Sequence, residues 1–328
     1  MADAGAPGGA VNAGSVLTVR VSEVAAEARD VVRLELRAAD GGALPPFEAG
    51  SHVEVTLPNG LIRHYSMTND CRERDRYVIA VGRAANGRGG SEYIHRALRC
   101  DARLRISTPR NNFALDPGAA RFLFLAGGIG VTPILAMIRW CEANARPWRL
   151  VYAARNRQRA AFYEELGTFG DRVRFHFDDE AGQFLDVAAA IADRAEGEHI
   201  YCCGPDPMMK AAETAATGLA PGTIRFERFA APEQAAPRDG DAFEVRLRRS
   251  GKAFVVPAGK SILETIEENG IVHPFSCREG LCGTCQTAVC EGVPDHRDYF
   301  LSDEERASGK TMMICVSRAT SPVLVLDI

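Results

Sequence analysis

The chain has 328 residues and a mass of 35.5 kDa, with 46% hydrophobic and 25% charged residues. This composition is typical of a folded globular protein and excludes a mostly disordered or collagen-like chain. The length predicts two or three domains. The net charge of −4 lacks the basic excess that a nucleic-acid-binding protein normally carries.

Residues 1–14 are rich in Gly, Ala and Pro, and we expect them to be a disordered N-terminus. They show neither the basic nor the apolar segment of a signal peptide. The longest apolar run, residues 122–138, contains three glycines and a proline, which indicates a strand, a turn and a helix rather than a membrane span. We therefore expect a cytoplasmic protein with no membrane or nucleic-acid partner.

Residues 15–118 predict a small β-barrel, because six short alternating or β-rich runs are separated by Gly, Pro, Asn and Asp. One helix candidate, residues 91–98, interrupts them. Residues 119–229 then alternate strands with helical segments, which predicts a doubly wound parallel sheet. Residues 230–240 have no apolar period and are interpreted as a linker.

Residues 241–328 form the third predicted domain. Two strand-like runs come first, followed by a helix with Ser261 as N-cap and Gly270 just past its end. A cysteine-rich loop follows, since five of the ten cysteines lie in the last 52 residues. Such clustering in a reducing compartment indicates a metal site rather than a disulfide framework.

Four of these cysteines have the ligand spacing of a plant-type [2Fe–2S] cluster, namely Cys277, Cys282, Cys285 and, after 29 further residues, Cys315. Three would come from one tight loop and the fourth from a strand around residues 312–318. Glycines within the loop permit the backbone angles that aim N–H groups at sulfur. A structural zinc site is the alternative, although zinc ribbons favour paired C-x2-C motifs.

A flavin site is predicted on a barrel strand that contains Arg63, His64, Tyr65 and Ser66. Tyr65 can stack on the isoalloxazine ring, Ser66 can reach its N5 atom, and Arg63 can neutralise a phosphate. The segment from Asn86 to Ser91 opens the helix candidate with a Gly-rich turn. Backbone N–H groups at such a helix start favour phosphate. A flexible hairpin turn is the alternative interpretation of that segment.

A dinucleotide site is predicted in residues 119–229. The sequence from Leu125 to Pro133 joins a strand to a helix through three glycines, which lets a pyrophosphate approach the helix start. Tyr201 to Pro205 ends a later strand, so both loops are expected to face one cleft at the carboxyl edge of the sheet. Asp178 and Asp179 end the third strand and could bind a ribose, whereas the arginines at 155, 157 and 159 could instead favour a 2′-phosphate.

The order of these motifs, R-x-Y-S, N-G-R-G-G-S, A-G-G-I-G-V-T-P, C-C-G-P and C-x4-C-x2-C…C, resembles that of the phthalate dioxygenase reductase family, to which vanillate demethylase reductases are similar. The resemblance runs from about residue 15 to residue 328. It implies a ferredoxin-reductase-like FMN barrel, a doubly wound NAD domain and a β-grasp plant-type ferredoxin domain.

The resemblance also implies which residues form the sites. The FMN contacts would be Arg63, His64, Tyr65, Ser66, Val81, Arg88, Gly89, Gly90 and Ser91. The NADH cleft would be lined by Gly128, Gly130, Thr132, Pro133, Asp178, Cys203, Gly204 and Pro205. Ser66, Cys203, Glu227 and Phe229 would take part in hydride transfer, with Phe229 covering the flavin ring. The D-H-R-D segment at residues 295–298 also matches the family, and we expect it to be a solvated turn.

The implied function is electron transfer from NADH to FMN, then to the [2Fe–2S] cluster and on to the Rieske centre of an aromatic-ring oxygenase. The seven histidines show no ligand spacing for a mononuclear iron of the chain's own, which favours a reductase component over the oxygenase itself. Three alternatives stay open: a reductase for another acceptor such as a cytochrome P450, a redox-sensing regulatory protein, and a zinc-stabilised protein with accidental motifs.

Overall fold

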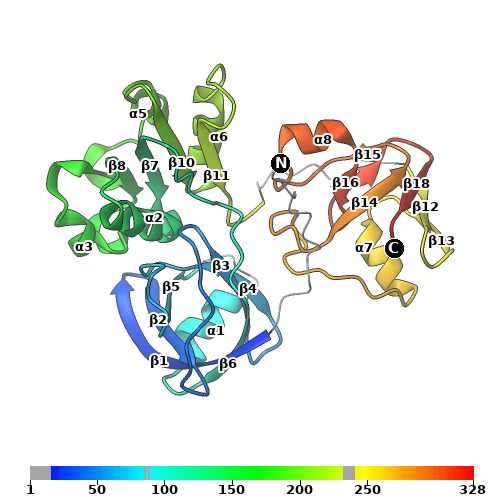
Figure 1. Ribbon diagram of the computed structural model, residues 1–328, viewed down its shortest axis with the longest axis horizontal. Coiled ribbons are helices and arrows are strands. Elements are labelled where there is room, and N and C mark those ends of the chain that lie inside the picture. Colours follow the sequence, from blue (N-terminus) through cyan, green and yellow to red (C-terminus); the bar gives the residue numbers. More distant parts are fainter. Residues whose placement is uncertain (1–15, 85–86, 88, 232–240) are drawn as a thin grey trace, which may run out of the picture.

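The structure, a computed structural model, describes residues 16–84, 87, 89–231 and 241–328. It contains three main sheets, each with its own hydrophobic core. Figure 1 shows the first two stacked beside each other and the third to one side of them. Arg88, a predicted FMN contact, and residues 1–14 and 232–240 lie outside the described residues.

The first sheet is antiparallel and has the strand order β4-β3-β6-β1-β2-β5. Its alternating strands direct Val, Leu and Ile side chains into one core, as the pattern predicted. A bridge between Met67, just past β4, and Ile79 of β5 brings the two ends of the order together and closes a barrel. The elements are β1 (Val16–Ala28), β2 (Val31–Ala38), β3 (His52–Thr56), β4 (Ile62–Ser66), β5 (Tyr77–Gly82), α1 (Gly90–Ala97) and β6 (Arg103–Ser107).

The second sheet is wholly parallel, with the order β11-β10-β7-β8-β9. Helices α2 and α3 pack on one face, and α5 and α6 pack on the other, as in a doubly wound fold. The strands are β7 (Arg121–Gly127), β8 (Trp148–Ala154), β9 (Val173–Phe177), β10 (Glu198–Cys203) and β11 (Ile224–Glu227). The helices are η1 (Gly128–Gly130), α2 (Val131–Ala143), η2 (Arg157–Arg159), α3 (Tyr163–Gly167), η3 (Gly170–Arg172), α4 (Asp178–Ala181), α5 (Val187–Ala192) and α6 (Asp206–Ala215).

The third sheet is mixed, with the order β13-β12-β18-β14-β16 and a parallel pair, β12 and β18, inside it. Helix α7 packs against it and starts at the predicted cap, where Ser261 and Glu264 form a reciprocal capping box. The strands are β12 (Phe243–Leu247), β13 (Ala253–Val256), β14 (Gln286–Glu291), β15 (Pro294–Asp295), β16 (Thr311–Met313), β17 (Arg318–Ala319) and β18 (Val323–Leu326). The helices are α7 (Ile262–Glu268) and α8 (Asp303–Ser308).

One strand prediction was wrong in a way that matters for the site. Cys315 does not lie in a strand, because β16 ends at Met313 and the chain turns immediately afterwards. The backbone N–H groups of Val316 and Ser317 both donate to the Met313 carbonyl oxygen, which closes this turn. Cys315 therefore sits at a bend beside the cysteine loop.

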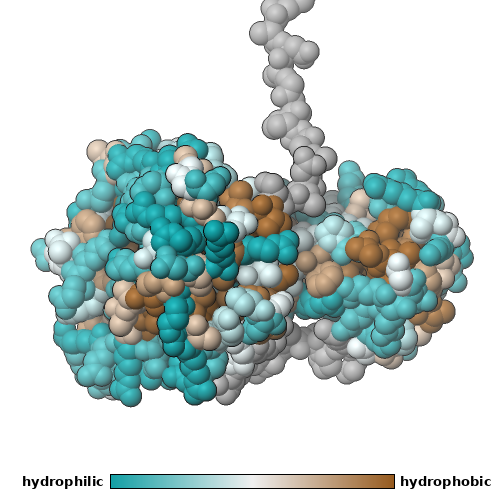
Figure 2. Space-filling view, turned by 90° about the horizontal axis from the view of Figure 1, so that it is seen from below, coloured by the Kyte–Doolittle hydropathy of each residue, from teal (hydrophilic) through white to brown (hydrophobic). Residues whose placement is uncertain are grey.

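The surface mixes hydrophilic and hydrophobic residues, and hydrophobic residues are exposed on both lobes seen from below (Figure 2). Within the described residues, no helix has the length and apolar character needed to cross a membrane.

Candidate functional site

A cavity of about 210 Å³ lies where the barrel meets the parallel sheet. The barrel contributes four consecutive residues of β4 and the turn that leads into α1, while the parallel sheet contributes the start of α2 and the segment after β11. The lining residues are Arg63, His64, Tyr65, Ser66, Ala80, Gly82, Ala84, Gly87, Gly90, Ser91, Ile129, Thr132 and Phe229. The predicted flavin motif and the predicted ring-covering phenylalanine thus line one cavity.

The side chains of β4 that line this cavity differ in how deeply they are buried. Ser66 is buried, and Tyr65 is buried enough to raise the pKa of its hydroxyl to about 12, which keeps it neutral. Arg63 lies against the start of α1, since a Cβ atom on Gly90 would come 2.6 Å from the Arg63 Nε atom. Only glycine leaves room for the guanidinium at this helix start, which is where an anionic group is favoured.

The start of α1 has two features of the predicted phosphate site among the described residues. Gly89 caps the helix with a φ of +82°, a left-handed conformation that favours glycine. The Ser91 hydroxyl accepts a hydrogen bond of 3.1 Å from the Ala84 N–H and so closes the turn. Val81 differs from the other predicted contacts, because its side chain packs in the barrel core and its neighbours Ala80 and Gly82 line the cavity instead.

The two glycine-containing loops of the parallel sheet meet at the carboxyl ends of β7 and β10, which are adjacent strands. A Cβ atom on Gly130 would lie 2.5 Å from the Cys203 carbonyl carbon, and one on Gly127 would lie 2.6 Å from Pro205 Cδ. The Thr132 hydroxyl donates to the Ile129 carbonyl oxygen at 2.9 Å, and Pro133 follows it, buried in the first turn of α2. Close backbone packing therefore shapes one cleft from both loops.

Asp178 lies at the same edge of the sheet, at the start of α4 just after β9. Its carboxylate is 3.5 Å from the Nε2 atom of His176. Arg157, from the run that could bind a 2′-phosphate, instead pairs with both oxygens of Glu180 at 2.6 and 3.0 Å and stacks over Phe177. Arg157 is thus paired within the chain, and Asp178 lies at the sheet edge where a ribose-binding carboxylate was predicted.

Cys203 and Glu227 are direct neighbours across the parallel pair β10 and β11. Burial, followed by the nearby Glu227 carboxyl, holds the pKa of the Cys203 thiol well above its ordinary value. Burial also raises the pKa of Glu227 to about 8, and its Oε2 atom finds no hydrogen-bond partner among the described residues. Two residues on, Phe229 is 45% exposed where it lines the cavity. A buried thiol and a buried carboxyl thus lie side by side, and the aromatic residue two positions after Glu227 lines the cavity.

The four predicted iron ligands come together around one loop. The thiols of Cys277 and Cys282 contact each other, those of Cys285 and Cys315 contact each other, and Cys277 also contacts Cys315. Among the described residues, no group of three or more His, Cys, Asp or Glu side chains is arranged around a single metal ion. The four thiols thus lie together at one loop and the turn beside it, as their plant-type [2Fe–2S] ligand spacing predicted.

Backbone N–H groups point at the sulfur atoms of this loop, as the glycines predicted. The Cys277 Sγ atom accepts from the N–H groups of Glu279 and Leu281 at 3.3 and 3.4 Å. Gly280 has a φ of +71°, and a Cβ atom there would lie 2.9 Å from Asp298 Cα. These donors are the kind that shield the negative charge of a thiolate-bound cluster, so the loop fits that group.

The D-H-R-D segment is not the solvated turn that we expected. Asp298 is 2% exposed and accepts hydrogen bonds from the N–H groups of Phe300 and Leu301 at 3.1 and 2.8 Å. The next residue, Tyr299, donates its N–H to the Gly280 carbonyl oxygen at 3.0 Å. Asp298 is buried where the segment packs on the cysteine loop, whereas residues 295–297 are half-buried.

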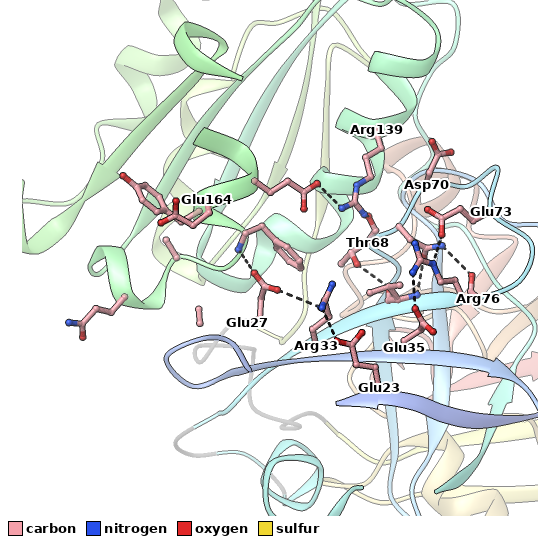
Figure 3. Close-up of a pocket in the computed structure, with 18 of the residues that line it drawn as sticks. Glu23, Glu27, Arg33, Glu35, Thr68, Asp70, Glu73, Arg76, Arg139 and Glu164 are labelled. Carbon is pink, nitrogen blue, oxygen red and sulfur yellow. Dashed lines mark hydrogen bonds and ion pairs between the residues drawn. The ribbon is translucent and has the colours of Figure 1, made fainter. Parts of the chain in front are cut away.

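A second cavity, of about 720 Å³, opens on another side of the junction between barrel and parallel sheet (Figure 3). Its lining is mainly charged, and its charges pair with one another: Arg139 bonds Glu165 at 2.6 Å, and Arg76 bonds Glu35 at 2.8 Å. Glu27 of the barrel accepts from the Phe162 N–H at 3.0 Å. Within the described residues it shares no lining residue with the flavin-side cavity. The Glu27 contact, together with the hydrogen bond that Arg139 donates to the Thr68 carbonyl oxygen, joins the barrel to the parallel-sheet domain.

Some residues at the sites carried no recognisable signal in the sequence. The smaller cavity is also lined by Ile129, Ala80 and Gly82. Ile129 lies inside the glycine motif but was not among the residues predicted to bind a cofactor. Arg110 and Asn112, which reach from the barrel to the cysteine loop, lie outside every motif. Their long-range partners could be found only from the fold.

A closed antiparallel barrel, a parallel nucleotide-binding sheet and a four-cysteine loop in one chain define an electron-transferring oxidoreductase with a [2Fe–2S] domain. Residues 245–320 match the 2Fe-2S iron-sulfur cluster binding domain family, and residues 124–214 match the Oxidoreductase NAD-binding domain family.

Relatives that match this chain over most of its length show the family to which it belongs. The vanillate O-demethylase oxidoreductase of Pseudomonas sp. (strain HR199 / DSM 7063) is 45% identical over 95% of this chain and 100% of its own. A solved phthalate dioxygenase reductase, described as a modular structure for electron transfer from pyridine nucleotides to [2Fe–2S], is 41% identical with a TM-score of 0.72, over 95% of this chain and 98% of that one. The chain belongs to the phthalate dioxygenase reductase family, which confirms the predicted fold class and the cofactor set of FMN, NADH and [2Fe–2S].

A different relative contains this unit as a part. An intact type IV self-sufficient cytochrome P450 monooxygenase is 37% identical, with a TM-score of 0.87, over 95% of this chain. The match spans only 41% of that longer chain.

Proposed function

We propose that this chain is the reductase component of a Rieske-type aromatic oxygenase or demethylase system. The observation that carries the proposal is the 210 Å³ cavity, because the barrel strand with Arg63, the NAD-sheet residue Thr132 and the aromatic Phe229 all line it. A flavin seated there would lie between the nucleotide loops and the cysteine loop. When bound, FMN and the [2Fe–2S] cluster supply the conversion of a two-electron hydride into single electrons.

Residues of the chain position these groups. On this proposal Arg63 and the α1 start, Gly89 to Ser91, hold the FMN phosphate, while Tyr65 and Ser66 contact the ring. NADH lies across the Gly128–Pro133 and Cys203–Pro205 loops, with its ribose on Asp178. The thiols of Cys277, Cys282, Cys285 and Cys315 hold the cluster.

Hydride transfer requires a dry site, and three groups provide it. Phe229, which lines the cavity, would cover the ring of a bound flavin and would make room for the nicotinamide. The neutral Cys203 thiol and the neutral Glu227 carboxyl border the nicotinamide without placing a charge beside it, since burial raises the pKa of both. Excluding water from this position protects the hydride from loss to solvent.

We also propose functional domains at residues 15–118 for FMN, 119–229 for NAD and 241–328 for the cluster, with 230–240 as the linker. A cytoplasmic location is part of the proposal, because clustered cysteines that bind a metal cluster are typical of a reducing compartment. The oxygenase would dock near the cysteine loop, where Val272 is 97% and Phe275 37% exposed. Exposed apolar side chains of this kind mark interaction surfaces.

A cytochrome P450 is the second candidate acceptor, since a self-sufficient P450 monooxygenase carries a similar unit. Anaerobic mixing of the NADH-reduced protein with a purified Rieske oxygenase or with a P450 tests both. We expect rapid bleaching of the Rieske absorption. Sustained reduction of the P450 alone would reassign the acceptor, and slow turnover with every acceptor would favour a redox sensor.

A further inference from the structure

A short polar contact joins the flavin-side strand to the cysteine loop. The Nε2 atom of His64, in the middle of β4, lies 2.8 Å from the Ser276 hydroxyl. His64 also lines the flavin-side cavity, and Ser276 precedes the predicted iron ligand Cys277. One hydrogen bond and one peptide link therefore connect a cavity-lining side chain to a residue of the cluster site.

A second contact from the barrel holds the other end of the same loop. The Arg110 guanidinium donates to Glu54 Oε1 at 2.8 Å and to the Thr284 hydroxyl at 3.0 Å. Asn112 donates to the Cys282 carbonyl oxygen at 3.4 Å. Both ends of the cysteine loop are thus tied to the barrel, and the segment between α7 and β14 extends toward β3 and β4 in Figure 1.

The barrel side of these contacts is rigidly placed. Glu54 and His64 are paired across β3 and β4, with the carboxylate oxygen 3.9 Å from His64 Nε2. His52 packs its ring 5.3 Å from that of His64, and burial lowers the pKa of His52 to about 3, so that ring stays neutral. His64 is therefore fixed by a neutral ring and a carboxylate before it meets Ser276.

We propose that His64 is a positioning residue that seats the cysteine loop against the flavin cavity, with Arg110 as the second anchor. This inference rests on the proposed function. Each NADH that is oxidised to NAD⁺ releases one proton and two electrons. The two electrons pass through this junction one at a time and reduce two equivalents of a one-electron acceptor. The position of the loop matters at such a junction, because electron transfer between two groups slows as their separation grows.

The test separates hydride transfer from the later electron step. Anaerobic rapid mixing with NADH follows the flavin and iron–sulfur absorption bands in the wild type and in Ser276→Ala. We expect unchanged flavin bleaching, because Ser276 lies outside the cavity lining, and cluster reduction about two- to tenfold slower, the factor given by losing one hydrogen bond. Ser276→Thr, which keeps the hydroxyl, is expected to restore the wild-type rate.

Further variants distinguish positioning from damage to the cluster. Arg110→Gln is expected to slow the same step, whereas Arg105→Ala, an exposed arginine of β6, is the matched control and leaves it unchanged. The double variant His64→Ala/Ser276→Ala is expected to be no slower in cluster reduction than His64→Ala alone. Each of the two substitutions removes the same hydrogen bond between His64 and Ser276, so their effects do not add. The electron paramagnetic resonance spectrum of the reduced cluster stays that of the wild type.

Several outcomes would overturn the proposal. Wild-type cluster reduction in both Ser276→Ala and Arg110→Gln would show that neither contact positions the loop. An altered cluster spectrum in every slowed variant would show a local effect on the cluster instead. If the wild type itself bleaches its flavin without reducing its cluster, the proposed function fails first, and this result is distinct from a failure confined to the variants.

Discussion

Gly130→Ala tests the packing that shapes the nucleotide cleft. Gly130 ends η1 at a φ of −61°, so alanine causes no backbone strain there. Its new Cβ atom would lie 2.5 Å from the Cys203 carbonyl carbon, still closer to its oxygen, and 2.9 Å from the Gly204 nitrogen. All three neighbours are backbone atoms, so no side chain can rotate away.

The size of the effect follows from this overlap. Non-bonded carbon atoms prefer a separation of about 3.5–4.0 Å, so the two loops must part by about 1 Å. Overpacking of this kind typically costs about 1–3 kcal/mol. Because the parted loops are those that line the NADH cleft, we expect NADH affinity to fall by about tenfold or more, which corresponds to about 1.4 kcal/mol.

The assay is NADH binding, measured by titration and as the KM for NADH with an artificial dye as acceptor. Gly167→Ala at the end of α3 is the matched control, because its φ is also negative and none of the described atoms lies within 4 Å of the added Cβ. We expect the control to bind NADH as the wild type does. Wild-type affinity in Gly130→Ala would refute the assignment of the cleft to these two loops.

Three other changes probe separate parts of the site. Cys315→Ser is expected to abolish the iron–sulfur absorption and iron content but retain NADH-to-dye activity, and simultaneous loss of flavin would contradict separable domains. Phe229→Ala is expected to change the hydride-transfer rate by about tenfold in rapid mixing, whereas wild-type rates with both NADH and NADPH would reject ring covering. Glu227 keeps its proton in the folded state up to about pH 8 but releases it near 4.5 when unfolded, so stability falls as pH rises through that window. Glu227→Gln is expected to reduce the pH dependence of the free energy of unfolding measured in urea. An unchanged pH dependence would show that the Glu227 carboxyl is exposed to water in the folded protein.

The elements with strong local signals could be predicted from the sequence. The capping box at Ser261 and the strand–turn–helix at residues 122–138 depend on residues close together in the chain, and the structure has each where we expected it. Local propensity decides such features before any tertiary contact forms.

The features that were missed depend on contacts between distant segments. Asp298 was expected in solvent because its neighbours are polar, yet Gly280 packs on its Cα and buries it. Cys315 was placed in a strand because its flanks are apolar, although the chain must bend to bring its thiol to Cys285. The bonds of Arg110 to Thr284 span 174 positions, and no local pattern encodes them.

The central claim is that one chain moves electrons from NADH through a flavin to its own cluster. An anaerobic NADH titration of the purified protein, followed by visible absorption, tests it most directly. We predict stepwise bleaching of both the flavin and the iron–sulfur bands, with uptake of about three electrons, two for FMN and one for the cluster. Bleaching of the flavin while the cluster stays oxidised, or a colourless protein that contains zinc, would contradict it.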